Sequence, residues 1–220
     1  MSFIKQDFLL SANKFDIPKS IDQSPGISLK GETIKSVLLS TDLSFIQNLS
    51  ADAIMIVNPF EKSNELDRFI IDFAKRPVIC DVGGGLFRED RAIQLALGAF
   101  EAGAAAVVLT KPTPPEMVAR IRNEIEGPLV YTVMFDAEDF EALSDAGVDI
   151  FNISTGEFTS QTVSKVRKLI PETSIMANGG PYDSTIRETI ESGAESIVFN
   201  PPTATEILRS VFDEYRNNKG

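Results

Sequence analysis

The feature that most constrains the fold of this 220-residue chain is a regular alternation of short apolar runs with longer segments of helical spacing. Runs of strand length begin at about residue 34, and a helical segment follows each of them. The eight runs are SVLLST (36–41), AIMIVNP (53–59), PVICDVG (77–83), AAVVLTK (105–111), PLVYTVM (128–134), VDIFNIS (148–154), SIMANGG (174–180) and ESIVFNP (195–201). Near-continuous apolar strands, each followed by a helix, predict a parallel sheet that is buried on both faces.

A second periodicity supports the count of eight strands. Glycines precede the fourth, sixth and eighth runs at Gly103, Gly147 and Gly193, whereas prolines stand at or just before the third, fifth and seventh. The pattern repeats about every 45 residues, so the chain consists of four quarters with two strands and two helices each. We therefore predict an α/β fold in which residues 34–220 form a single (β/α)8 barrel, the TIM barrel.

Residues 1–33 fall outside the repeat and form an N-terminal extension. Three arrangements are open for it: a plug in the bottom of the barrel, a docking segment for a partner subunit, or a simple packed extension. Two helix starts are also predicted, from TPPE with Thr113 as the N-cap and from the capping box TATE with Thr203 as the N-cap.

Composition excludes several classes of function. The net charge of −11 repels the phosphates of nucleic acids and anionic lipid surfaces, and no run approaches the roughly 18 apolar residues of a membrane helix. The single Cys80 permits neither a disulfide framework nor a cysteine-based zinc site, so we expect a cytoplasmic protein. Because the chain has no histidine, proton transfer would depend on Asp, Glu, Lys, Cys, Tyr or water.

Polar residues stand at the ends of most of the predicted strands, where the active sites of such barrels lie. Amide and hydroxyl side chains at this position suit hydroxyls, carbonyls or phosphate oxygens, because they donate and accept hydrogen bonds without titrating. The alternative is that each asparagine ends its strand by bonding to local backbone. The predicted ligand-binding residues are Asn58, Gly83, Gly84, Thr132, Asn152, Ser154, Asn178 and Asn200.

Asp81 and Lys111 end the third and fourth strands, which are neighbours in the predicted barrel. They are the pair of strand-end residues that can act as acid, base or imine former, so we predict them as the catalytic residues, with a plain ion pair as the alternative. Cys80 is expected to face the helices if Asp81 faces the mouth of the barrel. No metal-binding cluster is predicted.

The segment IMANGGPYDSTIRETIESGAESIVF (175–199) resembles aldolase-type barrels that bind phosphorylated ligands, including ribulose-phosphate-binding barrels and FMN-dependent barrel oxidoreductases. The resemblance implies that backbone N–H groups of Gly179 and Gly180 hold a phosphate. The eighth loop differs, because Pro201 and Pro202 stand where those families have small residues. The chain is also similar to an uncharacterised bacterial family of stand-alone barrels, sometimes labelled hydrolase, at SPGIS (24–28), VGGG (82–85), GGP (179–181) and PPT (201–203).

These observations favour a metabolic enzyme of lyase, isomerase or epimerase type, which acts on a small polar and phosphorylated ligand at the mouth. Two alternatives are open: a non-catalytic barrel for metabolite sensing or assembly, and an FMN-dependent oxidoreductase. The sequence requires no cofactor, and FMN or a divalent metal is not excluded. We expect an anionic small molecule as the partner, with neither nucleic acid nor membrane, and a homodimer is open.

Overall fold

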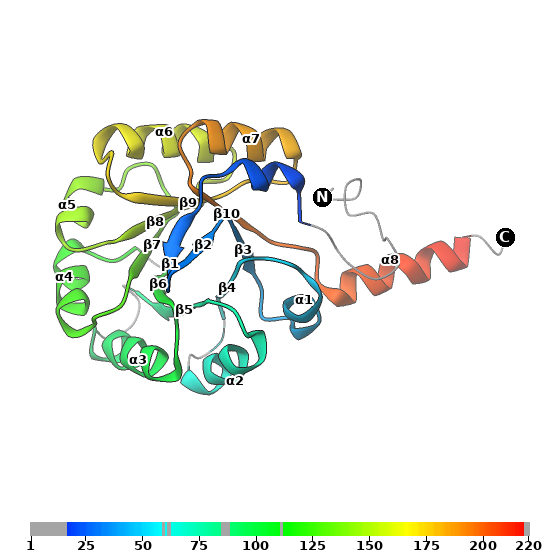
Figure 1. The fold of residues 1–220 in the computed structure, drawn as a ribbon, viewed down its shortest axis with the longest axis horizontal. Helices are drawn as coiled ribbons and strands as arrows, with labels where there is room; N and C mark the ends of the chain where they lie inside the picture. The colour runs from blue at the N-terminus through cyan, green and yellow to red at the C-terminus, as the bar shows by residue number, and fades with distance from the viewer. Residues whose placement is uncertain (1–16, 59, 61–62, 85–88, 111, 218–220) are drawn as a thin grey trace.

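The structure, a computed structural model, describes residues 17–58, 60, 63–84, 89–110 and 112–217. Eight parallel strands form a closed barrel with the order β10-β3-β4-β5-β6-β7-β8-β9 (Figure 1). The predicted (β/α)8 barrel is therefore confirmed. The barrel strands are β3 (Ser36–Leu39), β4 (Ala53–Ile56), β5 (Val78–Gly83), β6 (Ala106–Leu109), β7 (Leu129–Val133), β8 (Ile150–Ile153), β9 (Ser174–Asn178) and β10 (Ser196–Phe199).

A helix follows each barrel strand. The helices are α1 (Leu43–Asn48), α2 (Asn64–Ala74), α3 (Glu89–Ala102), α4 (Pro115–Glu124), α5 (Phe140–Asp145), α6 (Thr159–Leu169), α7 (Asp183–Glu191) and α8 (Ala204–Asn217), with short 3-10 helices η1 (Lys19–Gln23) and η2 (Gly156–Phe158). Within the described ranges, no helix is both long enough and apolar enough to cross a bilayer.

Successive side chains along each strand alternate between two separate cores. Outward-facing residues such as Cys80 and Tyr131 join the large core between the strands and the helices. Inward-facing residues such as Val108 and Met176 fill the barrel itself. The expectation that Cys80 faces the helices is thus confirmed, and burial raises the pKa of its thiol well above the usual range.

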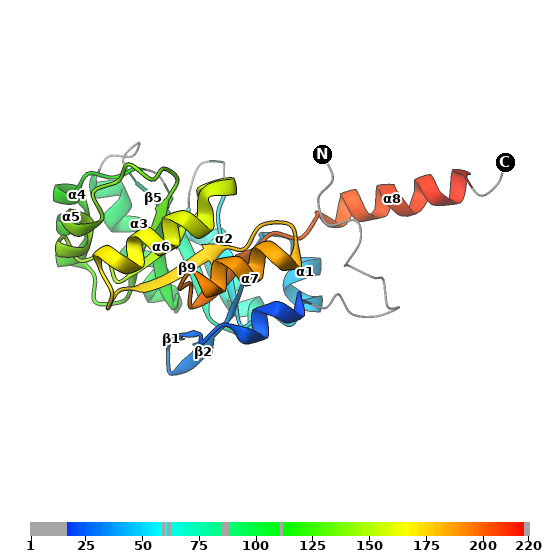
Figure 2. The same ribbon diagram turned by 90° about the horizontal axis from the view of Figure 1, so that it is seen from above.

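A hairpin of the N-terminal extension closes the bottom of the barrel. Strands β1 (Ile27–Leu29) and β2 (Glu32–Ile34) pair antiparallel to each other. Their apolar residues Ile27, Leu29 and Ile34 are buried and belong to the core inside the barrel. In the view of Figure 2, the hairpin protrudes from one end of the barrel. This hairpin therefore plugs one end of the barrel, which leaves the opposite end, where the strands finish, as the mouth.

The predicted four-quarter repeat has a physical basis at the ends of α3, α5 and α7. Gly103, Gly147 and Gly193 all have positive φ, between 100° and 112°, and end α3, α5 and α7. The next residue in each case donates its N–H back to a carbonyl five residues earlier, for example Ala194 to Thr189. This is the glycine-terminated helix end that a left-handed residue permits, and it turns the chain into the next strand.

At the bottom of the barrel, acidic side chains accept hydrogen bonds from backbone N–H groups at the starts of strands. These side chains again occur at the spacing of the repeat. The Asp52 carboxylate accepts hydrogen bonds from the N–H groups of Lys35 and Ser36, both at 2.9 Å. Asp149 does the same for the N–H of Leu129 at 2.7 Å, and Glu195 for the N–H of Ile175 at 2.9 Å. These carboxylates satisfy backbone donors at the strand starts, so they serve stability.

The two predicted helix starts have different outcomes. Thr203 and Glu206 form the capping box, since the Glu206 carboxylate accepts the Thr203 N–H at 2.8 Å and the Thr203 hydroxyl accepts the Glu206 N–H at 3.2 Å. The prediction for Thr113 is wrong, because Pro114 is the N-cap of α4. The Thr113 N–H donates to the Tyr131 hydroxyl at 3.1 Å, so this backbone group contacts β7.

Candidate functional site

The mouth of the barrel is lined by the last inward-facing residue of each strand. From β5 round to β9 these residues are polar: Asp81, Thr110, Thr132, Asn152, Ser154 and Asn178. Each of them lies above the apolar core that fills the barrel. Half of the predicted ligand-binding residues therefore lie on one side of the mouth, and we call this set of polar residues the polar arc.

Asp81 is buried at the start of the polar arc, and hydrogen bonds hold its carboxylate in place. One carboxylate oxygen accepts the Gly83 N–H and the Thr110 hydroxyl, each at 2.8 Å. The chain bulges here, because the pairing with β6 shifts between Asp81 and Gly83. Gly83 and Gly84 both have positive φ, which a residue with a side chain rarely adopts, so the glycines allow the turn behind the carboxylate. Lys111, the predicted partner of Asp81, lies outside the described residues.

Thr132 and Asn152 form the middle of the arc, on the adjacent strands β7 and β8. The Asn152 amide donates to the Thr132 hydroxyl at 3.1 Å, and its side-chain oxygen is buried without a hydrogen-bond partner. Asn152 is only 4% exposed. If the amide were turned over, its NH₂ group would be left unsatisfied in place of the oxygen. In either orientation, one buried polar group of Asn152 lacks a hydrogen-bond partner.

Ser154 and Asn178 complete the arc on β8 and β9. The Asn178 amide donates to the Ser154 hydroxyl at 2.9 Å. Both residues are partly exposed at the rim, above the more deeply buried Thr132 and Asn152. The arc thus has two levels of paired amide and hydroxyl groups, which suits a ligand with several oxygen atoms.

The other two predicted asparagines do not lie in this arrangement. The Asn58 side chain accepts the Phe60 N–H at 3.0 Å, so it stabilises its own loop as the backbone-bonding alternative predicts. Asn200 is exposed at the end of β10. These two residues follow β4 and β10, on the side of the barrel opposite the centre of the polar arc.

Gly179 and Gly180 have different roles. The Gly179 N–H donates to the Val198 carbonyl at 3.4 Å, and a Cβ at this position would meet Ile186 at 2.7 Å and Ile197 at 2.9 Å. Gly179 is therefore required for the packing of α7 on the barrel. Gly180 is exposed with φ of +74°, and a Cβ there would meet the Thr185 hydroxyl at 2.7 Å. Of the two glycines, only Gly180 is placed to offer its N–H to an anion.

On the remaining side of the mouth, the last inward-facing residues of β3 and β4 are apolar, which the sequence analysis did not anticipate. A cavity of about 230 Å³ lies between the loops after β3 and β10. Its apolar lining comes from Leu39, Phe45, Val57, Pro201 and Pro202, and we call this side the apolar arc. This apolar side could have been predicted from the sequence, because Leu39 and Val57 are inward-facing residues at strand ends. The sequence analysis considered only polar residues at these positions.

The charge at the mouth is negative in the described part of the chain. Asp42 lines the cavity between the loops after β3 and β10, and Asp81 lies in the polar arc. No lysine or arginine directly follows any barrel strand among the residues that the structure describes. The same residues contain no group of three or more His, Cys, Asp or Glu side chains that could hold a metal ion. An anionic ligand would thus depend on backbone N–H groups or on Lys111.

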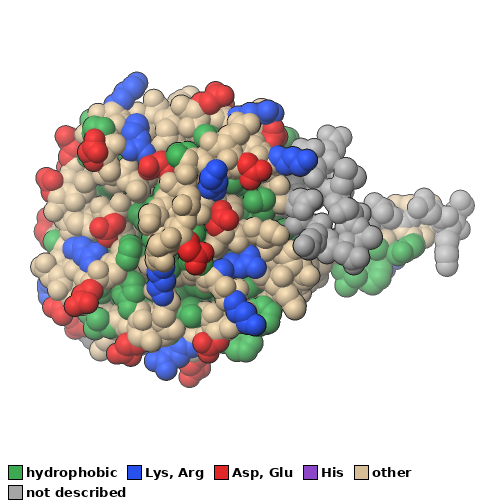
Figure 3. Space-filling model, in the orientation of Figure 1, with side chains coloured by type: hydrophobic (Ala, Val, Ile, Leu, Met, Phe, Trp, Pro, Cys, Tyr) green, Lys and Arg blue, Asp and Glu red, His purple; other side chains and the backbone are tan. Residues whose placement is uncertain are grey.

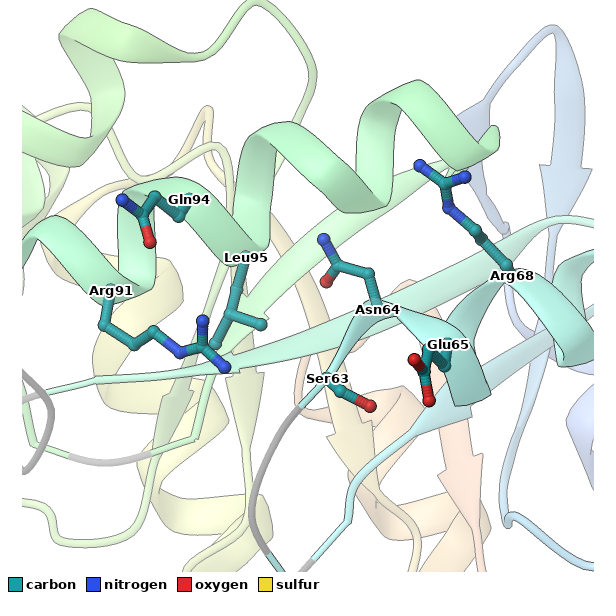
Figure 4. A pocket seen from close by; sticks show the side chains of 7 residues that line it. All are labelled: Ser63, Asn64, Glu65, Arg68, Arg91, Gln94 and Leu95. Atoms are coloured by element: carbon teal, nitrogen blue, oxygen red, sulfur yellow. The ribbon is translucent and has the colours of Figure 1, made fainter.

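A larger cavity, of about 430 Å³, lies beside the mouth between the starts of α2 and α3 (Figure 4). In Figure 4 the Asn64 side chain points from α2 toward α3. It occupies the space above Gly98, where a Cβ would lie 1.6 Å from the Asn64 amide nitrogen. The cavity is a surface recess at the contact between two helices, and it does not open among the polar residues of the strand ends. We therefore place the candidate site in the mouth.

Comparison with solved structures finds the same fold in enzymes of the aldolase type. Phosphonopyruvate hydrolase in complex with oxalate and Mg²⁺ matches with a TM-score of 0.65 at 16% identity, over 84% of this chain and 83% of that chain. A putative dihydrodipicolinate synthetase from Pseudomonas aeruginosa matches with a TM-score of 0.62 at 14% identity, over 76% and 70%. A putative phosphonomutase from Burkholderia cenocepacia J2315 matches with a TM-score of 0.64 at 13% identity, over 83% and 92%.

The sequence comparisons give no further assignment. No protein-family model matches the chain, and no curated protein matches it. At identities of 13–16% the structural matches establish the fold alone. The chain therefore shares the (β/α)8 barrel fold of these proteins, and its function has to be argued from its own residues.

Proposed function

We propose that the protein is a metabolic enzyme of lyase, isomerase or epimerase type, which binds a small polar ligand in the polar arc. The observation that carries this proposal is the unsatisfied amide of Asn152, buried at 4% exposure above the core of the barrel. Leaving such a group without a partner costs about 1–3 kcal/mol. A bound ligand that forms a hydrogen bond with this group would remove that cost.

Each part of the arc has a distinct role in this proposal. Asp81 transfers a proton, because its carboxylate is fixed by Gly83 and Thr110 at the edge of the mouth. Asn152 and Asn178 orient hydroxyl or carbonyl oxygens of the ligand. Lys111, which follows β6 in the sequence, is proposed as the second catalytic group. A phosphate on the ligand would bind the N–H of Gly180.

The class of ligand is a further part of the proposal. Phosphonopyruvate hydrolase, which shares the fold, has been solved in complex with oxalate, and small carboxylates therefore belong among the compounds to test beside sugar phosphates. The proposed location is the cytoplasm, since the single Cys80 is buried and unpaired.

A non-catalytic sensing barrel is the second candidate, and the charge of the mouth favours it. Ionisable side chains are few among the described strand ends, where Asp81 is the buried one. A sensor would use the same amide and hydroxyl pairs without moving a proton. Its distinguishing property is that it binds a ligand and does not turn it over.

The test is the thermal stability of the purified protein with a panel of compounds: sugar phosphates, their unphosphorylated parents, inorganic phosphate and 2-oxo acids such as pyruvate. A ligand at about one hundred times its dissociation constant adds about 2.7 kcal/mol, which raises the melting temperature by roughly 5–10 °C for a chain of this size. We expect Thr132→Val/Asn152→Leu to abolish the shift. If it keeps the shift, the ligand binds outside the polar arc.

Turnover of the compound that binds then separates an enzyme from a sensor. A Gly180→Val variant addresses the phosphate, because a β-branched side chain is strained at this φ and contacts Thr185. We expect this variant to bind phosphorylated compounds more weakly and to bind their unphosphorylated parents as the wild type does. Equal losses for both would show that Gly180 does not contact a phosphate.

A further inference from the structure

The last helix does not pack where a (β/α)8 barrel would place it. From α1 to α7, each helix packs against the next one around the barrel. Helix α8 has no comparable contact with α7 or α1, and it projects away from the barrel (Figures 1 and 2). The ring of helices is therefore incomplete between α7 and α1. In the described part of the chain, the five-residue η1 lies against α7 on this flank.

The base of α8 is anchored, so its direction is set by the chain. The Asp42 carboxylate, in the loop after β3, accepts the Ala204 N–H at 3.1 Å. Pro201 and Pro202 precede the helix, and consecutive prolines favour an extended backbone that cannot turn sharply back onto the barrel. The capping box of Thr203 and Glu206 then starts the helix. These contacts hold the start of α8 at the rim while its body leaves the barrel.

One side of α8 is apolar and exposed. Leu208, Phe212 and Tyr215 are 53%, 47% and 66% exposed and follow one another at helical spacings of four and three. Figure 3 shows hydrophobic side chains gathered on the projecting helix. On the polar side, Arg216 pairs with Asp213 at 3.0 Å. A 14-residue helix is marginally stable in water by itself, so another surface is needed to cover this stripe.

We propose that a second copy of this chain covers the stripe, by reciprocal exchange of α8 into the flank between α7 and α1. Among the residues that the structure describes, each copy has one helix without a packing site and one flank without a full-length helix, so the arrangement is self-complementary and closed under two-fold symmetry.

The stripe supplies a large part of the area that a dimer of this kind needs. Phe212 and Tyr215 are 47% and 66% exposed, so at about 150–250 Å² per aromatic residue their burial from both copies removes roughly 340–560 Å² from water. With a similar area on the flanks that receive them, these two side chains account for roughly 700–1,100 Å², and the exposed Leu208 adds to this toward the roughly 1,200–2,000 Å² of a stable interface.

The experiment measures the mass of the full-length protein in solution by light scattering and sedimentation, for the wild type and for two variants. We expect a dimer for the wild type and a monomer for Phe212→Asp. Phe69→Asp is the control, because Phe69 on α2 is also an exposed aromatic residue, at 55%, and its variant should stay dimeric. A monomeric wild type, or a Phe212→Asp variant that remains a dimer, would overturn the proposal.

Hydrogen exchange identifies the surface that receives α8. If the wild-type dimer exchanges α8, Phe212→Asp should remove the protection of α8, α1 and α7 together. The exchange rates of the most protected amides in these three helices should rise at least tenfold. Loss confined to α8 would show that the helix pairs with something other than the flank, and the exchange would be wrong. Variants that unfold are recognised by loss of protection in the barrel strands, and Leu208→Asp then replaces Phe212→Asp.

Discussion

The two ends of the barrel are built from the same strands and differ in how their polar groups are satisfied. At the bottom, Asp52 accepts two backbone N–H groups and the Ser36 hydroxyl, and the hairpin seals the core beneath. At the mouth, Asn152 keeps a buried polar group without a partner, and at the bottom the Ser196 hydroxyl at the start of β10 does so too. The difference therefore lies in the carboxylates and amides: the carboxylates at the bottom bind backbone N–H groups and serve stability, whereas the amides at the mouth pair with hydroxyl side chains of the polar arc. Variants at the two ends should therefore have opposite consequences.

The largest expected effect lies at the mouth. Asp81→Asn keeps an oxygen that accepts from Gly83 and Thr110 but removes the group that transfers a proton. Turnover of the ligand found in the panel should fall about 10²–10⁴-fold, the usual contribution of a general acid or base. Stability in urea should change by less than about 1 kcal/mol. Asp72→Asn, at an exposed position of α2, is the control, and an equal rate for the two variants would remove Asp81 from the mechanism.

At the bottom the expectation is reversed. Asp52→Ala leaves the N–H groups of Lys35 and Ser36 without their acceptor, and we expect the free energy of unfolding to fall by about 2–4 kcal/mol. The ligand-induced shift in melting temperature should persist, because the site is at the other end of the barrel. Urea titrations with and without ligand measure both quantities. A variant that is stable but no longer binds would contradict the division between the two ends.

Tyr131 lies in the outer core near the mouth and sharpens the comparison through pH. Burial raises its pKa to about 12, the Thr113 N–H opposes this, and the nearby Glu138 carboxylate adds to the rise. A folded-state pKa above the ordinary value of about 10 means that the stability is complete below pH 10 and is lost as the pH rises toward 12.

The corresponding variant is Tyr131→Phe, which leaves the Thr113 N–H without the hydroxyl at 3.1 Å. It should lose about 1–2 kcal/mol at pH 7, and its stability should depend less on pH between 10 and 12. Chemical denaturation at pH 7, 10 and 11.5 tests this. An unchanged pH dependence would mean that Tyr131 ionises equally in the folded and unfolded chains.

The smallest expected change in stability belongs to the double variant Thr132→Val/Asn152→Leu. It replaces a hydrogen-bonded pair and its unsatisfied group by apolar side chains, so the protein should be neutral or more stable by about 1 kcal/mol. Ligand binding should be lost. A clear loss of stability would show that the amide of Asn152 does not destabilise the free protein, and this would weaken the proposed function.

Much of the fold could be predicted because it depends on periods that are short in sequence. The alternation of runs gave the number of strands, and the glycines at 103, 147 and 193 marked the helix ends at the spacing of the repeat. The N-cap of α4 was predicted wrongly because the segment TPPE has the local pattern of a helix start. The Thr113 N–H instead donates to the hydroxyl of Tyr131, which lies 18 residues away in the sequence. The candidate site was predictable only as a set of strand ends, and the apolar arc was missed.

The sequence by itself determined the side of the barrel wall on which each strand residue lies. A period of two places Cys80 among the helices and Asp81 inside the barrel, independently of any distant contact. Only the tertiary structure decided that Asn152 is left with an unsatisfied group, that Asn58 serves its own loop, and that Gly179 packs against Ile186. These outcomes depend on closure of the barrel and on side chains brought together from separate strands and helices. The direction in which α8 leaves the barrel was also decided by the tertiary structure. Its apolar stripe predicts that the helix packs against another surface, but the stripe does not show which surface that is.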